Sequence, residues 1–333
     1  MRRGPALAAA LGAGIALCAG LAWSREQGAP VGPAVSPAPG REVAITFDDL
    51  PAVSVAKGDP DSLAVFTDRL LRHFTSHQVP VVGFVNEGKL TVQSEGLEAQ
   101  AARIGLLRRW VDQGLELGNH TYSHRSLNDL TIEEFEADVV RGEPVIMALL
   151  GAQGLKLRYF RHPFLQVGLN LDKRHAFEAW LAARGYTVAP VTIDNDEYIF
   201  AAVYANALKA GDSELARRAA EAYLTYMEAV FDFAEGLSQN LFGRPIRHVL
   251  LFHANELNAD HAGRLFDRLR QRNYTFVPLA RALEDPAYRS ADAYVGRWGI
   301  SWMHHWEQAL GRARTGAPDP PPWVSEAYER ARR

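Results

Sequence analysis

The chain is almost without cysteine. Its 333 residues contain one, Cys18, which lies in an apolar stretch near the N-terminus. If that stretch is removed, no thiol remains, so a disulfide framework, a catalytic thiol and a zinc-thiolate site are all excluded. The chain also lacks a block of one charge, because 36 Lys and Arg against 39 Asp and Glu give a formal net charge of −3. We therefore expect no nucleic-acid partner and a neutral substrate.

The first forty residues have the composition of an export signal followed by a linker. Arg2 and Arg3 precede an uncharged stretch rich in Ala, Gly and Leu, which ends at an A-x-S cleavage pattern. We predict a signal peptide over 1–24 and a Pro/Gly-rich linker over 25–40. The alternative is an uncleaved membrane anchor, because the stretch is nearly long enough to span a bilayer. With cleavage, the protein is expected to be periplasmic or secreted, without an integral membrane span.

From residue 41 onward, short β-type runs alternate with longer amphipathic runs, which predicts a parallel α/β fold. Seven strands are predicted, at 42–47, 79–86, 115–119, 156–161, 187–193, 248–253 and 274–277. Helices are predicted between them at 62–77, 97–113, 131–150, 172–184, 203–236 and 259–272. Seven such units suggest a barrel or partial barrel, whose chemistry lies at the carboxyl ends of the strands. The oversized segment before the sixth strand is long enough to form a lid or a groove wall.

Two adjacent carboxylates, Asp48 and Asp49, end the first predicted strand. Neighbouring side chains of a regular strand point to opposite faces, so both can serve one pocket only if the strand stops or bends there. The following Leu50-Pro51 supports a stop, because proline does not continue a ladder.

Two histidines, His120 and His124, follow the third predicted strand. Their spacing of four brings two imidazoles to the same side of a helical turn. Two imidazoles and one carboxylate can hold a divalent cation with positions open for water and substrate, and a second carboxylate can take the proton of that water. We therefore interpret Asp48, Asp49 and these histidines as a metal site with a built-in base.

Polar residues also follow the fourth, fifth and sixth strands. Arg161 can hold a neighbouring carboxylate ionised, although a structural salt bridge is the commoner use of such an arginine. An acid among Asp194, Asp196 and Glu197 would raise the proton affinity of a histidine that it faces. His253, after an apolar run, is the remaining strand-end candidate for a general acid.

In this order, the elements resemble the polysaccharide deacetylases of the NodB-homology type, carbohydrate esterase family 4. The resemblance covers roughly residues 41–285, which it identifies as the catalytic domain, and leaves 286–333 as a C-terminal helical extension. It implies a distorted (β/α)7 barrel with a long helical insertion before the sixth strand. The motifs that carry it are Thr46-Phe47-Asp48-Asp49, His120 to His124, Arg161 to Phe164, and the leucine-histidine motif that closes at His253.

The resemblance implies a role for each of these residues. Asp48 would be the catalytic base, Arg161 would steady it, and His253 would be the acid. A divalent metal would be the cofactor, with zinc as the default and cobalt or nickel fitting the same ligands. The metal ligands would be Asp49, His120 and His124.

One motif departs from the family pattern. Glu197-Tyr198 stands where the family usually has an aspartate-tryptophan pair, and Asp194 matches an earlier aspartate. Glu197 or Asp196 would then supply the carboxylate beside the acid histidine, and Tyr198 can still stack on a sugar. Phe164 replaces a tyrosine whose backbone N–H serves the family as an oxyanion donor. The altered pair puts the shape of the sugar subsite, and therefore the substrate, in question.

The implied activity is metal-dependent removal of N-acetyl groups from a chitin-like or peptidoglycan-like polysaccharide or oligosaccharide. The expected partner is thus an N-acetylated carbohydrate. An O-acetyl polysaccharide esterase would use the same residues. A catalytically inactive carbohydrate-binding protein is the third alternative, and the complete base, metal and acid set argues against it. The sequence does not indicate an oligomeric state.

Beyond residue 285, three tryptophans stand at i, i+4 and i+8, namely Trp298, Trp302 and Trp306. We expect this stripe to pack onto the barrel rather than to stack on sugars. His304 and His305 are expected on the surface of the same helix.

Overall fold

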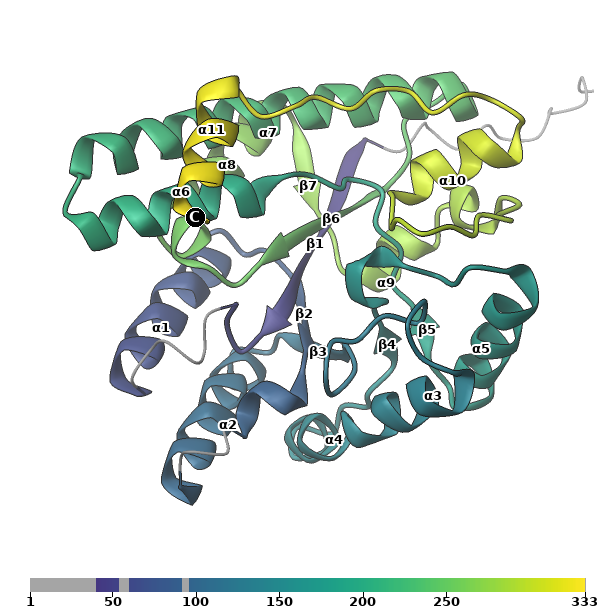
Figure 1. Cartoon of the computed structure of the whole chain (residues 1–333), viewed down its shortest axis with the longest axis horizontal. Coiled ribbons are helices and arrows are strands. Elements are labelled where there is room, and N and C mark those ends of the chain that lie inside the picture. Colours follow the sequence, from purple (N-terminus) through teal and green to yellow (C-terminus); the bar gives the residue numbers. More distant parts are fainter. Residues whose placement is uncertain (1–39, 54–59, 92–95, 333) are drawn as a thin grey trace, which may run out of the picture. The chain divides into compact units, whose positions relative to one another are not determined.

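A parallel sheet of seven strands lies at the centre of the molecule (Figure 1). The structure is a computed structural model and describes residues 40–53, 60–91 and 96–332, so the predicted signal peptide and nearly all of the linker lie outside it. The described strands are β1 (Arg41–Leu50), β2 (Val81–Val85), β3 (Glu116–Asn119), β4 (Tyr159–Phe160), β5 (Thr187–Val188), β6 (His248–His253) and β7 (Tyr274–Phe276).

The sheet is a distorted barrel rather than a flat layer. Its strands follow the order β5-β4-β3-β2-β1-β6, and a parallel bridge between Ile193, just beyond β5, and Leu250 of β6 joins the two ends of this order. β7 does not extend the ring, because it pairs with Arg41 to Val43 at the start of β1. The predicted barrel class is therefore confirmed, with the seventh strand outside the ring.

Helices surround this sheet (Figure 1). Among the described residues, no helix combines the length and the apolar character that a membrane span requires. The helices are α1 (Pro60–Ser76), α2 (Leu97–Asp112), α3 (Ile132–Arg141), α4 (Pro144–Gly151), α5 (Leu171–Ala183), α6 (Glu197–Ala210), α7 (Ser213–Phe242), α8 (Glu256–Gln271), α9 (Leu279–Leu283), α10 (Trp302–Ala309) and α11 (Pro322–Ala331).

Two predicted helices are each two helices in the structure. The segment 131–150 breaks into α3 and α4, because Pro144 lacks an N–H and starts a new helix at its first turn. The segment 203–236 begins earlier and breaks between α6 and α7 at Gly211, which has a left-handed φ of 72°. Asp212 then caps α7 by accepting a hydrogen bond from the Leu215 N–H at 2.9 Å. These two helices form the predicted insertion before β6.

The C-terminal residues pack onto the same compact unit. Trp302 and Trp306 are buried in a second hydrophobic cluster, whereas Trp298 lies before α10 and is 68% exposed. The prediction that His304 and His305 lie on the surface is wrong. His305 is fully buried, and its Nδ1 lies 2.9 Å from the carboxylate of Asp292, so burial does not leave that nitrogen without a partner.

Phe47 connects the main core to the strand that carries the two aspartates. Its ring is fully buried, with centroids 5.1 Å from Phe74, 6.0 Å from Trp110 and 5.4 Å from Phe252. Because side chains alternate along a strand, Asp48 points to the opposite face, into the barrel. The aromatic cluster thus fixes the orientation of β1 directly behind the site.

We expect Phe47→Ala to lower the free energy of unfolding by about 3–5 kcal/mol, because it removes a large ring from a packed core. Urea denaturation followed by circular dichroism measures this loss. Val65→Ala on α1 is the control, since Val65 is 63% exposed and its loss should cost less than about 0.5 kcal/mol. Equal losses in the two variants would contradict the role of the cluster.

Candidate active site

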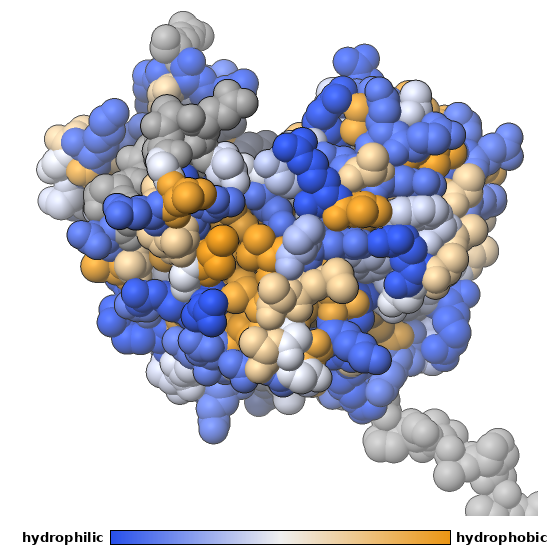
Figure 2. All heavy atoms as spheres, turned by 90° about the horizontal axis from the view of Figure 1, so that it is seen from below, coloured by the Kyte–Doolittle hydropathy of each residue, from blue (hydrophilic) through white to orange (hydrophobic). Residues whose placement is uncertain are grey.

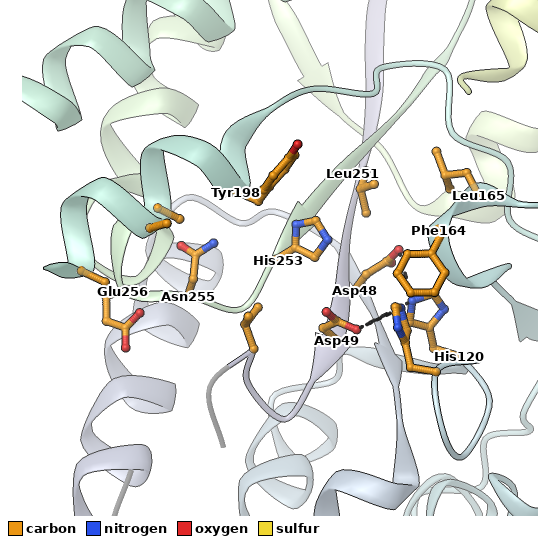
Figure 3. A pocket seen from close by; sticks show the side chains of 15 residues that line it. Asp48, Asp49, His120, Phe164, Leu165, Tyr198, Leu251, His253, Asn255 and Glu256 are labelled. Carbon is orange, nitrogen blue, oxygen red and sulfur yellow. Dashed lines mark ion pairs between the residues drawn. The ribbon is translucent and has the colours of Figure 1, made fainter. Parts of the chain in front are cut away.

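A pocket of about 450 Å³ opens at the carboxyl ends of β1, β3 and β6 (Figure 3). Arg161 and Glu197 contact the pocket residues from behind. Asp194 lines a different pocket, together with Asp196 and Arg314. The predicted site residues that line the main pocket are Asp48, Asp49, His120, His124, Phe164, Tyr198 and His253.

The two aspartates share the pocket because β1 bends between them. Asp49 has a left-handed φ of 68°, and the pairing of β1 with β2 shifts register between Phe47 and Leu50. On the other side, Asp48 pairs in register with His253 of β6. The strand therefore bends where the sequence requires it to stop or bend, although pairing continues to Leu50.

The two histidines lie on a loop, so the predicted helical turn is wrong. Thr121 and His124 have left-handed φ values of 65° and 56°. The Thr121 N–H donates to Asn119 Oδ1 at 2.7 Å, and the His124 N–H donates to Thr121 Oγ1 at 3.0 Å. These side-chain bonds stabilise a conformation that the backbone alone disfavours. They hold the rings of His120 and His124 with centroids 4.8 Å apart.

Asp49, His120 and His124 form a set that can hold a divalent metal. Their ligand atoms lie within 4.8 Å of one another, and Asp49 Oδ1 is 3.4 Å from His124 Nε2 and 3.9 Å from His120 Nε2. His120 Nδ1 donates to the Arg161 carbonyl at 2.8 Å, which leaves its Nε2 with a free lone pair. Burial lowers the pKa of both histidines and so favours the neutral form that binds metals. Within the described part of the chain, buried Asp49 Oδ1 has no hydrogen-bond partner, so the set fits a cation.

Lys89 is a site residue that the sequence did not reveal. It lies on a short 3₁₀ helix (Glu87–Leu90), with Nζ 3.4 Å from Asp49 Oδ1 and 3.0 Å from the Asp49 carbonyl oxygen. Burial raises the pKa of Asp49, but the charges of Lys89 and His124 lower it by more, so the net pKa lies well below the usual range. Asp49 is therefore ionised. No strand end or motif marks this lysine in the sequence.

Asp48 is buried deeper and interacts with Arg161 as predicted. Arg161 Nη1 lies 3.4 Å from Asp48 Oδ2, and its Nη2 donates to Thr46 Oγ1 at 3.0 Å. Burial raises the pKa of Asp48 to about 6, although Arg161 and His253 lower it. The arginine thus only partly offsets burial and does not by itself hold the carboxylate ionised. A carboxylate with this pKa suits a general base near neutral pH.

Glu197 is the carboxylate that faces His253. It is 1% exposed at the start of α6, and its Oε2 lies 3.0 Å from His253 Nδ1. The side-chain amides of Asn255 and Asn258 donate to its Oε1. Burial lowers the pKa of His253, but the hydrogen bond and charge of Glu197 raise it, with a net value of about 9. The sequence analysis did not identify Asn255 and Asn258 as partners of Glu197. The one signal in the sequence that could have indicated them is their position shortly after His253.

The remaining predicted residues lie farther from this centre. Asp194 Oδ1 accepts the Asn195 N–H at 3.0 Å, and within the described residues no hydrogen bond joins it to His253. Tyr198 is at the rim, 48% exposed, with its ring edge-to-face against Tyr328 of α11 at 5.9 Å.

Phe164 lies on a turn that the C-terminal extension holds. It has a left-handed φ of 56°, and its ring packs edge-to-face on His124 with centroids 4.4 Å apart. A Cβ at Gly299 would lie 1.7 Å from the Phe164 carbonyl oxygen, so only glycine permits this approach. Nearby, Gln166 Nε2 donates to the Arg297 carbonyl at 2.8 Å. We call residues 292–302 the C-terminal strap.

The strap is itself anchored by a buried ion pair. Arg174 of α5 donates two hydrogen bonds, of 2.9 and 2.8 Å, to the two carboxylate oxygens of Asp292. Arg174 also donates to the Tyr294 carbonyl at 2.7 Å, and His305 contacts Asp292 from α10. Bidentate pairs of this kind fix orientation as well as distance.

Comparisons with known proteins find similar sequences and structures. Residues 36–178 match the family model of the polysaccharide deacetylases. A peptidoglycan-N-acetylglucosamine deacetylase of Bacillus cereus is 23% identical over 158 residues, which are 47% of this chain and 46% of that protein. The match thus spans about half the length of this relative.

Two solved structures are also similar. One is a peptidoglycan N-acetylglucosamine deacetylase, with a TM-score of 0.46 and 18% identity over 74% of this chain and 90% of that one. The other is a family 4 carbohydrate esterase from Bacillus anthracis, with a TM-score of 0.44 and 16% identity over 73% and 83% of the two chains. Over residues 36–178, this chain is therefore similar to the polysaccharide deacetylases.

In the metal-free protein, we expect Glu197→Gln to lower the pKa of His253 from about 9 to 6.5 or below, because the opposing effect of burial remains. An NMR titration of the imidazole measures this shift. The folded pKa lies above the ordinary value, so the pair stabilises the fold fully below about pH 6.5 and loses this effect as the pH rises through 9. Asp196→Asn is the control, and an unchanged pKa in Glu197→Gln would contradict the assignment.

We expect Gly299→Ala to displace the Phe164 turn and to cost about 1–3 kcal/mol of stability, because the new methyl group has no space. Gly316→Ala is the matched control, since nothing lies within 4 Å of a Cβ there. Urea denaturation gives the stability, and crystal structures of both variants give the position of the ring against His124. A destabilised Gly299→Ala variant with an unmoved Phe164 would contradict the positioning role of the strap.

Proposed function

We propose that the protein is a metal-dependent deacetylase that removes N-acetyl groups from the amino sugars of a polysaccharide or oligosaccharide. The observation that carries this proposal is the content of one pocket: a three-residue ligand set, a buried carboxylate with a pKa near 6, and a histidine with a pKa near 9. The similarity to the Bacillus cereus enzyme, whose substrate is a peptidoglycan amino sugar, supports the same class of substrate.

Zinc is the metal we propose for Asp49, His120 and His124, because two imidazoles and a carboxylate are common zinc ligands, while cobalt or nickel would also fit. When bound, such a metal polarises the acetamide carbonyl and acidifies water. Asp48 then accepts the proton of the attacking water, and Arg161 orients Asp48. The Phe164 N–H is our candidate donor to the developing oxyanion.

His253 completes the reaction by donating a proton to the departing amine. Its raised pKa keeps it protonated at neutral pH, and Glu197 holds the ring by its Nδ1. This feature favours amide hydrolysis over ester hydrolysis, because an unprotonated amine is the poorer leaving group. An O-acetyl esterase remains the second candidate, since it would use the same residues.

We also propose export to the periplasm or the exterior, supported by the signal-like composition of residues 1–24. Such a location would give the enzyme access to cell-wall or extracellular polysaccharide. N-terminal sequencing of the mature protein after expression in a bacterial host tests the predicted cleavage after Ser24, and an intact N-terminus would favour the membrane anchor.

Measurements of metal content and activity should distinguish the base, Asp48, from the metal ligands. We expect Asp48→Asn to keep its zinc but to lose about 10²–10⁴-fold in acetate release, because it lacks the base. His120→Ala should lose both the metal and the activity. Mass spectrometry of bound metal and enzymatic acetate detection on chitin oligomers and peptidoglycan fragments measure the two properties. His175→Ala is the control, since His175 is exposed on α5.

Two outcomes would contradict the proposal. Full activity in a metal-free His120→Ala variant would remove the metal from the mechanism. Acetate release from acetylated xylan, without release from any N-acetylated substrate, would identify an esterase.

A further inference from the structure

We infer that the natural substrate carries an apolar group next to the bond that is hydrolysed, and that one face of α6 receives this group. The inference rests on the proposed function for the location of the reaction. The inference adds an apolar group to the description of the substrate, a feature that the metal ligands, base and acid do not determine.

The first support is the face that α6 presents to the pocket. Tyr198, Ala201, Ala202 and Ala205 all line it, at positions i, i+3, i+4 and i+7 of the helix. This spacing forms a single stripe along one side of a helix. The three alanines of this stripe leave open space where larger side chains would fill the pocket, and the surface that they present is apolar. We call this stripe the alanine face.

The second support is the shortage of polar partners for a sugar. The lining of the pocket also includes the apolar residues Val53, Leu165 and Leu251. The amide of Asn255 is partly used, because it donates one N–H to Glu197 and its oxygen accepts from the Asn258 N–H. Outside the ligand, base and acid set, the described lining residues whose side chains keep a polar group for a hydroxyl are Tyr198, Asn255 and Glu256.

The third support is continuity with a second hollow of about 420 Å³. The two hollows share Ala205 and Glu256. The second hollow is mixed in character, because Leu63 and Phe66 lie there together with polar residues such as Arg69 and Asn206. It also contains Lys209, which continues the stripe of the alanine face toward the end of α6. With a rise of 1.5 Å per residue, the face from Tyr198 to Lys209 is roughly 16 Å long. This length is much greater than the length of an acetyl group.

The space-filling view agrees with this reading. Figure 2 looks at the end of the molecule where the strands terminate, and hydrophobic residues gather in its central hollow between hydrophilic flanks. In Figure 3, His253 lies between Tyr198 of α6 and the two aspartates, so a group on the alanine face is adjacent to the reacting bond.

The apolar group can belong to either side of that bond. It is an N-acyl chain longer than acetyl, or an alkyl aglycone on the amino sugar. Both share the same chemistry, a flexible hydrocarbon chain attached to an N-acylated amino sugar. Substrates that vary one side at a time distinguish the two.

The test uses three defined substrates with the zinc-loaded enzyme. The reference is methyl N-acetylglucosaminide; the other two carry a hexanoyl group on nitrogen or an octyl group as the aglycone. We expect at least one long substrate to exceed the reference at least tenfold in kcat/KM, because each buried methylene contributes roughly fourfold. Values at or below the reference for both long substrates would overturn the inference.

Variants of the alanine face then locate the effect. Ala205→Phe should lower the preference for the long substrate at least fivefold, and Ala202→Leu gives a second, smaller obstruction in case the first variant folds poorly. Ala210→Phe is the control, because Ala210 is an exposed residue at the end of the same helix. An equal preference in Ala205→Phe and Ala210→Phe would also overturn the inference.

A binding measurement separates this inference from the proposed function. Calorimetry with the octyl glycoside reports on the alanine face even if no substrate is hydrolysed. Tighter binding of the octyl than of the methyl glycoside to the wild type, lost in Ala205→Phe, supports the inference. Absence of hydrolysis of all three substrates together with that result would reject the proposed function alone.

Discussion

The bend of β1 at Asp49 is the constraint on which the site depends. In a regular strand, two successive carboxylates would lie on opposite faces, and the ligand set and the base would occupy different environments. The left-handed φ of Asp49 turns its carboxylate to the side of Asp48. The surrounding structure stabilises this conformation. Asp48 pairs with His253 of β6, and the aromatic cluster holds Phe47, the residue before Asp48.

The bend places two identical groups side by side, and their surroundings then give them different properties. Asp48 is enclosed and has its pKa raised to about 6, while the charges of its neighbours, first Lys89 and then His124, lower the pKa of Asp49 and keep it ionised. On the other side of the pocket, Glu197 raises the pKa of His253. A pocket that separates the pKa values of its acids and bases in this way can assign proton donor, proton acceptor and ligand without any change in residue type.

The sequence predicted the ring of strands and most of the pocket, because strand ends meet at one edge of a parallel sheet. It could not predict the loop of His120 and His124, whose left-handed residues depend on backbone hydrogen bonds that the side chains of Asn119 and Thr121 accept. It could not choose between Glu197 and Asp196, since that choice depends on where α6 begins. Lys89 was missed for a related reason: periodicity describes neighbours along the chain and not contacts through space.

The C-terminal strap changes what must be regarded as the catalytic unit. The family motifs end well before it, yet it holds the turn of Phe164 through contacts between positions as far as 131 residues apart, Gln166 and Arg297. During synthesis, the barrel strands emerge long before the segment that fixes this turn. A chain that lacks residues 292–302 would therefore contain every motif residue and still lack the contacts that hold Phe164 beside His124.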